Sequence, residues 1–130
     1  MRHGDQVKYL APLAVVMGCA MTPPRDLPHP GPEPTAAQAE NIARGYLETV
    51  LKDPDSLKAF KIIRGPYQRD YLLDIGVPWR RAYVVCFTYN AKNSYGAYAG
   101  SQLGVVTMTG ANPAPRLIDA IPEIHRHIYC

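Results

Sequence analysis

Cysteine and histidine are the residue types in this chain best suited to chemistry. Cys86, His125, His127 and Cys130 could supply a thiolate with a nearby imidazole, or three ligands for a zinc ion. However, Cys86 lies inside a strongly apolar segment, where thiols are usually buried and inert, and no histidine is near it in the sequence. The cluster at 125–130 is an incomplete ligand set at a chain end. We therefore expect no catalytic residue, no metal site and no cofactor.

The alternative is a hydrolase or a metal-dependent enzyme acting on cell-wall material. It requires a fold that brings His125 or His127 beside Cys86. The sequence contains no G-x-S-x-G nucleophile motif, no H-E-x-x-H zinc motif and no glycine-rich phosphate loop. A solvent-free Cys86 would count against the enzyme, and we expect a non-catalytic protein.

Residues 1–18 have the pattern of a secretory signal peptide. Arg2 and Lys8 precede an uncharged apolar run, residues 9–18, which is about half the length needed to span a bilayer. A signal of this kind is removed during export. We therefore expect the mature protein to begin after Gly18 and to lie in the cell envelope.

The end of the signal resembles a bacterial lipobox, with the residues Val16, Met17 and Gly18 before Cys19. This resemblance implies cleavage after Gly18 and a fatty-acyl anchor on Cys19, so the membrane is an expected partner. Ala20 is not the aspartate that usually retains lipoproteins in the inner membrane. We expect attachment to the outer membrane, facing the periplasm, with a soluble periplasmic protein as the alternative.

Composition divides the mature chain in two. Prolines crowd residues 19–34 and predict an extended tether with a reach of up to about 45 Å. Residues 35–130 carry apolar periodicity and are predicted to form one small domain. The chain of 130 residues has a net charge of +3, from 14 Lys and Arg against 11 Asp and Glu. This charge is too low for a dedicated nucleic-acid binder, so we expect no nucleic-acid partner.

The cysteines also predict a disulfide bond. If Cys19 is lipidated, Cys86 and Cys130 remain as a pair in an oxidising compartment. A bond between them would join the terminal segment to the central strand, with a stabilisation of roughly 4 kcal/mol in the chain-entropy estimate. Two free thiols are the alternative, because the sequence does not place the two Cα atoms within bonding distance.

An amphipathic helix is the clearest element in the sequence. Thr35 and Gln38 form a capping-box pattern, apolar residues then recur every three or four positions, and Pro54 ends the pattern. The apolar face of this helix must pack on another element. The sequence therefore predicts a helix at the start of the folded domain.

Several segments rich in β-branched and aromatic residues predict strands. Residues 80–90 and 101–109 have the strongest patterns, and weaker extended segments are expected at 57–63 and 67–75, separated by a Gly-Pro pair. We expect an α+β fold in which one N-terminal amphipathic helix packs on a small antiparallel sheet of three to four strands.

Two strings of residues carry a family resemblance. One is Asp-Pro-Asp-Ser at 53–56, and the other is the run 85–100, which contains Asn-Ala-Lys-Asn-Ser-Tyr-Gly. Over roughly residues 40–110 the chain resembles a group of small exported bacterial proteins, many of them predicted lipoproteins. The resemblance implies an envelope location and a small α+β domain, and it implies no catalytic residue.

The second string also contains the candidate binding loop. Its hydrogen-bond donors, acceptors and flat rings suit the recognition of a glycan or a peptide. The candidate residues are Tyr89, Asn90, Lys92, Asn93, Tyr95 and Tyr98. A purely structural hairpin, with its tyrosine rings covering the sheet, is the alternative. A binding loop would expose its rings, and a structural loop would bury them.

The sequence thus predicts a non-catalytic lipoprotein of the cell envelope, anchored through the lipid on Cys19. Its role would be that of a binding or structural module, with an envelope protein complex or peptidoglycan as partner. The sequence does not choose between these two partners.

Overall fold

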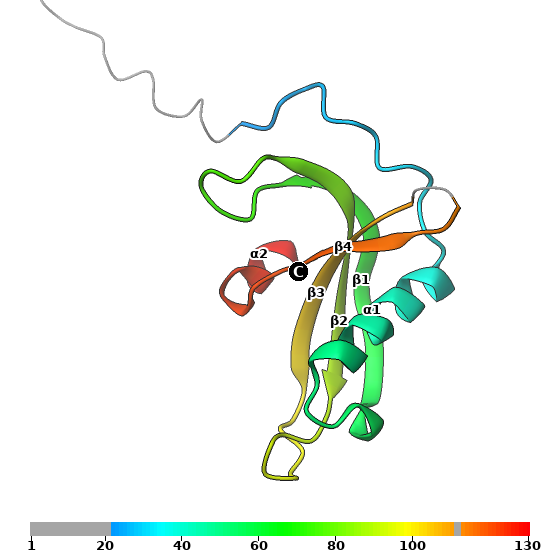
Figure 1. The fold of residues 1–130 in the computed structure, drawn as a ribbon, viewed down its shortest axis with the longest axis vertical. Helices are drawn as coiled ribbons and strands as arrows, with labels where there is room; N and C mark the ends of the chain where they lie inside the picture. The colour runs from blue at the N-terminus through cyan, green and yellow to red at the C-terminus, as the bar shows by residue number, and fades with distance from the viewer. Residues whose placement is uncertain (1–21, 111–112) are drawn as a thin grey trace, which may run out of the picture.

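The computed structural model describes residues 22–110 and 113–130, and Figure 1 shows their arrangement. The predicted signal peptide and Cys19 lie outside the described residues. One antiparallel sheet, in the order β1-β2-β3-β4, forms the centre of the domain. The strands are β1 (Lys58–Tyr71), β2 (Arg80–Asn90), β3 (Gln102–Thr109) and β4 (Arg116–Ala120). The helical elements are α1 (Ala36–Val50), η2 (Pro54–Ser56), η3 (Glu123–His125) and α2 (Arg126–Tyr129).

The sequence of α1 satisfies both its first turn and one face. The Gln38 backbone N–H donates to Thr35 Oγ1 at 3.1 Å, and the Thr35 N–H donates to the Gln38 side chain at 2.9 Å. This is the predicted capping box. Ala39, Ala43 and Leu47 are buried in a core shared with the sheet. The spacing of these three residues therefore places one face of the helix against the sheet.

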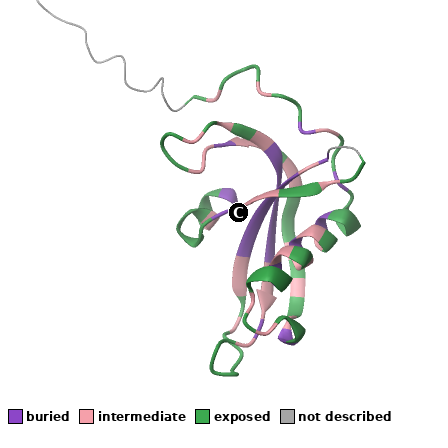
Figure 2. Ribbon diagram, in the orientation of Figure 1, coloured by how far each residue is buried: buried purple, intermediate pink, exposed green. Residues whose placement is uncertain are grey.

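The central strand, β2, is buried on both faces. Residues 82–87 are all buried, as Figure 2 shows for the middle of the sheet. Alternate side chains belong to two separate cores: Tyr83, Val85 and Phe87 on the α1 side, and Ala82, Val84 and Cys86 on the side of the C-terminal segment. Two-sided burial explains why this strand is continuously apolar in the sequence.

The predicted fold class is wrong in describing one N-terminal helix on the sheet. α1 is preceded by an extended segment, residues 22–34, and the opposite face of the sheet carries the short elements η3 and α2. The observed architecture is a four-stranded antiparallel sheet with a 15-residue helix inside the chain and a C-terminal segment on the other face.

The extended segment contacts the sheet through its carbonyl groups. The Tyr83 hydroxyl donates to the Gly31 carbonyl at 2.6 Å, and the Gly110 N–H donates to the Pro30 carbonyl at 2.8 Å. Proline has no N–H group, but its carbonyl still accepts hydrogen bonds. The prediction of a domain that begins with the helix was wrong for a physical reason. The prolines of residues 19–34 show that this segment cannot form a helix or an interior strand, but they do not show whether it packs against the sheet.

β1 is a single strand where the sequence suggested two segments. Its pairing with β2 shifts register at three places, and Gly65 lies at one of these irregularities. Gly65 has a φ of +93°, and a Cβ there would collide with the Val84 carbonyl oxygen. Only glycine fits this close approach, and the strand accommodates the Gly-Pro pair as a bulge instead of ending.

Candidate functional site

The candidate binding loop lies at one end of the long axis of the domain (Figure 1). Residues 91–100 connect β2 to β3, and the described start of the chain, at residue 22, lies toward the opposite end. Within the loop, Lys92 and Tyr98 form an antiparallel bridge. The loop is therefore a small hairpin, and residues 93–99 at its tip are exposed.

The two strings of the family resemblance meet at this end. The Lys92 N–H donates to Ser56 Oγ at 2.8 Å, and the Ser56 hydroxyl donates to the Asp53 carbonyl at 2.7 Å. Ser56 is buried, with 8% of its surface exposed. The Asp-Pro-Asp-Ser turn therefore supports the base of the loop directly.

The two candidate asparagines shape the loop. Asn90 Oδ1 accepts from the Gly100 N–H at 3.0 Å. Asn93 Oδ1 accepts from the N–H groups of Tyr95 at 2.9 Å and of Ala97 at 3.2 Å. Bonds from an asparagine side chain to the following backbone are typical of tight turns. The geometry thus assigns Asn90 and Asn93 a structural contribution.

The three candidate tyrosines have different surroundings. Tyr89 packs against Phe87, with ring centroids 5.9 Å apart, and burial raises the pKa of its hydroxyl. Tyr98 is 40% exposed, while Tyr95 at the tip is 93% exposed. By the criterion stated from the sequence, Tyr89 behaves as a structural residue, and Tyr95 and Tyr98 as residues available for contact.

Lysines gather around Tyr98. Lys58 Nζ lies 3.7 Å from the centre of the Tyr98 ring, and Lys92 Nζ lies 5.8 Å from it. The ion pairs among the described residues are all made by arginine, so neither ammonium group has a carboxylate partner there. Two like charges on one ring repel each other, and a bound anion would relieve this repulsion.

A shallow hollow lies between the end of α1 and the loop. It has a volume of about 190 Å³. Its lining includes Leu51, Lys52, Tyr89, Lys92 and Gln102. The hollow continues the lysine-bearing surface and adds amide and phenol groups to it. Apolar walls with a few polar groups are typical of small-molecule and sugar sites.

Lys58 also belongs to this site, although no pattern in the sequence marks it as a candidate. It lies on β1, far along the chain from the loop, and reaches the site because its strand begins directly after the Asp-Pro-Asp-Ser turn. The sequence held one indirect signal of this proximity, because the strings 53–56 and 85–100 both belong to the same family resemblance. Residues that recur as a pair of strings can be spatial neighbours, and here they are.

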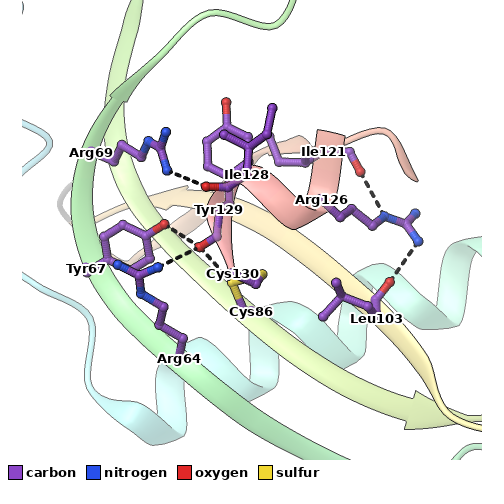
Figure 3. The surroundings of a disulfide bond; sticks show 10 residues. All are labelled: Arg64, Tyr67, Arg69, Cys86, Leu103, Ile121, Arg126, Ile128, Tyr129 and Cys130. Carbon is purple, nitrogen blue, oxygen red and sulfur yellow. Dashed lines mark hydrogen bonds between the residues drawn. A yellow bond between two sulfur atoms is a disulfide. The ribbon is translucent and has the colours of Figure 1, made fainter. Parts of the chain in front are cut away.

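The predicted disulfide between Cys86 and Cys130 is confirmed. The two Cα atoms are 6.0 Å apart, and the bond closes a sequence separation of 44 residues. Figure 3 shows the bond beneath the C-terminal segment. Cys86 Sγ also lies 3.3 Å from the Tyr129 carbonyl oxygen, but a disulfide sulfur carries no proton, so this is a contact and not a hydrogen bond.

Side chains from β1 hold the same segment. Tyr67 and Arg64 donate to the Tyr129 carbonyl at 2.7 and 3.2 Å, and Arg69 donates to the Ile128 carbonyl at 3.0 Å (Figure 3). Carbonyls at a helix end have no partner within the helix, and these donors supply one. The C-terminal segment is thus fixed by one covalent bond, by one phenol donor and by two guanidinium donors.

The enzymatic alternative requires Cys86 beside His125 or His127, and the structure places all three residues. Cys86 has no exposed surface and its sulfur is in the disulfide, so the oxidised protein offers no thiolate at this position. His125 and His127 are exposed. Within residues 22–110 and 113–130, no group of three His, Cys, Asp or Glu side chains could hold a metal ion.

No helix in the described part of the chain is long and apolar enough to cross a membrane. Comparisons with family models, with curated proteins and with solved structures found no match. The family resemblance therefore stays a prediction that rests on the two strings, which the fold brings together at the candidate binding loop.

Proposed function

We propose that this protein is a non-catalytic binding module of the cell envelope, anchored by a lipid on Cys19. It contacts another envelope component through the loop of residues 91–100. One observation carries the proposal: the fold joins two distant sequence strings at the end that leaves Tyr95 almost fully exposed. A loop with a purely structural role would bury this ring.

The chemistry of the loop favours peptidoglycan over a protein partner. An exposed tyrosine ring can stack on the face of a sugar, as aromatic rings do in many glycan sites. The ammonium groups of Lys58 and Lys92 have no carboxylate partner among the described residues, and the peptide stems of peptidoglycan carry carboxylates. A charge-assisted hydrogen bond between such groups is stronger than a neutral one.

The shape of the domain supports the same function. The described start of the chain and the candidate loop lie toward opposite ends of the long axis (Figure 1). A domain anchored through its N-terminus would therefore present Tyr95 away from the membrane. This end of the domain would then face a peptidoglycan layer that lies beside the membrane.

Co-sedimentation with isolated peptidoglycan sacculi tests the proposal. The lipidated protein, kept soluble in detergent, is expected to pellet with the sacculi, and Tyr95→Ala and Lys58→Ala are each expected to weaken binding severalfold. Ile63→Ala is the matched control, because Ile63 is an exposed apolar residue on β1, at 48%, and lies outside the loop. Wild-type protein that stays in the supernatant would contradict peptidoglycan binding, and co-purification of an envelope complex would then support the protein partner.

The lipid anchor is tested by the intact mass of protein taken from the membrane fraction of its own host. The expected mass is that of residues 19–130 plus acyl chains. A mass without acyl chains would contradict the anchor and favour the soluble periplasmic form. The sacculus assay does not depend on this outcome, so the two parts of the proposal can fail separately.

A further inference from the structure

The domain has an apolar surface outside the candidate binding loop. A hollow of about 240 Å³ lies between the β1–β2 connection and the C-terminal segment. Its lining includes Leu72, Leu73 and Ile121. Ile75 and Ile128, which also line it, are 92% and 50% exposed, and Ile124, in η3 between the lining residues Pro122 and His125, is 72% exposed. We call these three isoleucines the apolar rim. Single exposed apolar residues are common, but a group around an apolar hollow marks a contact surface.

The N-terminal segment reaches the domain beside this rim. Leu27 and Pro28 line a hollow together with Pro78 and Trp79, which belong to the same β1–β2 connection that carries Ile75. The Leu27 carbonyl also accepts a hydrogen bond from Arg81 Nη1 at 3.0 Å. The chain therefore enters the domain at the end where the apolar rim lies.

The length of chain before this docking point limits where the domain can be. Leu27 is eight residues after Cys19 in the sequence. Eight residues span at most about 28 Å when fully extended. A lipid on Cys19 would therefore hold this end of the domain within reach of the bilayer. Because residues 27–31 are docked, the remaining proline-rich segment cannot act as a longer spacer.

Charges near the rim are of both signs. Arg69 and Arg126 point their guanidinium groups at backbone carbonyls of nearby segments. Asp74 lines the hollow at the rim, and Glu123 lines a second hollow together with Arg126. The charges do not favour an anionic surface over a neutral one. The attraction at this end must therefore be apolar, and it should depend little on salt.

We propose that the apolar rim is a membrane-contacting surface, which inserts into the acyl-chain boundary of the bilayer that holds the lipid anchor. This inference rests on the proposed lipid anchor at Cys19, and it adds a second contact between the domain and the membrane. The anchor and the rim together fix the orientation of the domain: the side formed by the β1–β2 connection and α2 faces the bilayer. The candidate binding loop lies toward the opposite end of the long axis from the described start of the chain (Figure 1).

The single tryptophan of the chain provides the test. Trp79 lies in the β1–β2 connection, so tryptophan fluorescence reports on this end of the domain alone. The lipidated protein is placed in phosphatidylcholine vesicles, with and without bromine on the acyl chains. Brominated chains quench tryptophan only on contact. We expect clear quenching of Trp79 that persists at high salt.

Substitutions assign the quenching to the rim. The double variant Ile75→Asp with Ile124→Asp should lose most of the quenching, because a carboxylate does not enter the acyl region. Ile63→Asp is the matched control, since Ile63 is 48% exposed on β1 and does not line the hollow. Equal quenching in the double variant and the wild type would overturn the inference.

Flotation of the vesicles on a density gradient separates the inference from the function on which it rests. Protein that does not float with the vesicles contradicts the lipid anchor. Protein that floats but keeps an unquenched Trp79 contradicts the membrane-contacting surface alone. If that unquenched protein also cross-links to itself through a cysteine placed at Ile75, the rim is an interface with a second copy instead.

Discussion

The two faces of the sheet are covered in different ways. One face is packed by α1, a 15-residue helix whose buried residues Ala39, Ala43 and Leu47 meet three apolar side chains of β2. The other face is covered by a C-terminal segment in which α2 has only 4 residues. That segment is fixed by a disulfide and by Arg64, Tyr67 and Arg69.

The comparison shows that a small domain can cover two hydrophobic cores in different ways, one with a long helix and one with a short segment. A helix of several turns buries enough apolar surface to hold its own position. A single turn does not, and the covalent bond and the side-chain donors compensate for the missing area. The C-terminal face should therefore depend on redox state and on polar contacts, and the α1 face on side-chain volume.

Loss of the disulfide should have the largest effect. Replacing both cysteines, Cys86→Ala with Cys130→Ala, is expected to lower the free energy of unfolding by about 4 kcal/mol, because the bond constrains a long loop of the unfolded chain. Urea denaturation measures this loss, and hydrogen exchange locates it. Exchange should rise more at α2 than at α1, and an equal rise at both would contradict the comparison.

Truncation of the α1 core should have the next largest effect. Leu47 is 1% exposed, and Leu47→Ala is expected to lower the free energy of unfolding by about 3 kcal/mol through a cavity and lost contacts. Reduction of the disulfide should leave this difference unchanged to within about 0.5 kcal/mol if the faces are independent. A strong coupling between Leu47→Ala and the cysteine replacements would show that they are not.

Tyr71 gives the C-terminal face a dependence on alkaline pH. Its hydroxyl is 2.6 Å from Asp119 Oδ2 and 2.9 Å from Thr107 Oγ1, and burial together with the Asp119 hydrogen bond raises its pKa above 10. The folded state therefore favours the protonated phenol. The stabilisation is complete below pH 10 and is lost as the pH rises through the folded-state pKa.

Thermal unfolding across alkaline pH measures this effect in the wild type and in Tyr71→Phe. At neutral pH the variant should lose about 1.5 kcal/mol, because it removes hydrogen bonds that the buried Thr107 shares. Above pH 10 the wild type should lose stability faster than the variant. Parallel curves would show that Tyr71 does not carry the pH dependence.

The smallest effect is expected at acid pH from Asp70. Arg81 donates two hydrogen bonds to its carboxylate, at 2.6 and 3.0 Å, and holds the pKa of Asp70 below 3.8. This contribution is present above pH 3.8 and is lost as the pH falls through the lower folded-state pKa. Salt screens a pair this close to the surface, so the effect is modest. Asp70→Asn should remove it, as acid titration of the melting temperature would show.

The sequence predicted the elements whose signals are local. The capping box of Thr35 and Gln38 and the apolar run of β2 are each contained within a few residues, and both are found. The docking of Pro30 and Gly31 was not predicted, because a carbonyl acceptor leaves no trace in the residue type. The continuity of β1 was hidden for a similar reason, since its bulge at Gly65 depends on the neighbouring strand.

The candidate site was predicted in part. The residues of the loop are contiguous, so their types alone suggested a contact surface. Their different contributions depend on exposure, which separates Tyr95 from Tyr89, and on hydrogen bonds, which give Asn90 and Asn93 a structural contribution. Lys58 could not be found from composition, because only the fold brings β1 to the ring of Tyr98.

The docked N-terminal segment also decides how mechanical load enters this protein. The Pro30 carbonyl accepts from both Gly110 and Thr109, at the end of β3, and the Gly31 carbonyl accepts from Tyr83 on β2. A pull on the N-terminal segment is therefore delivered to the two central strands before it reaches α1. Several hydrogen bonds hold the segment at this point, so the helix and its core are shielded from a force applied at the N-terminus.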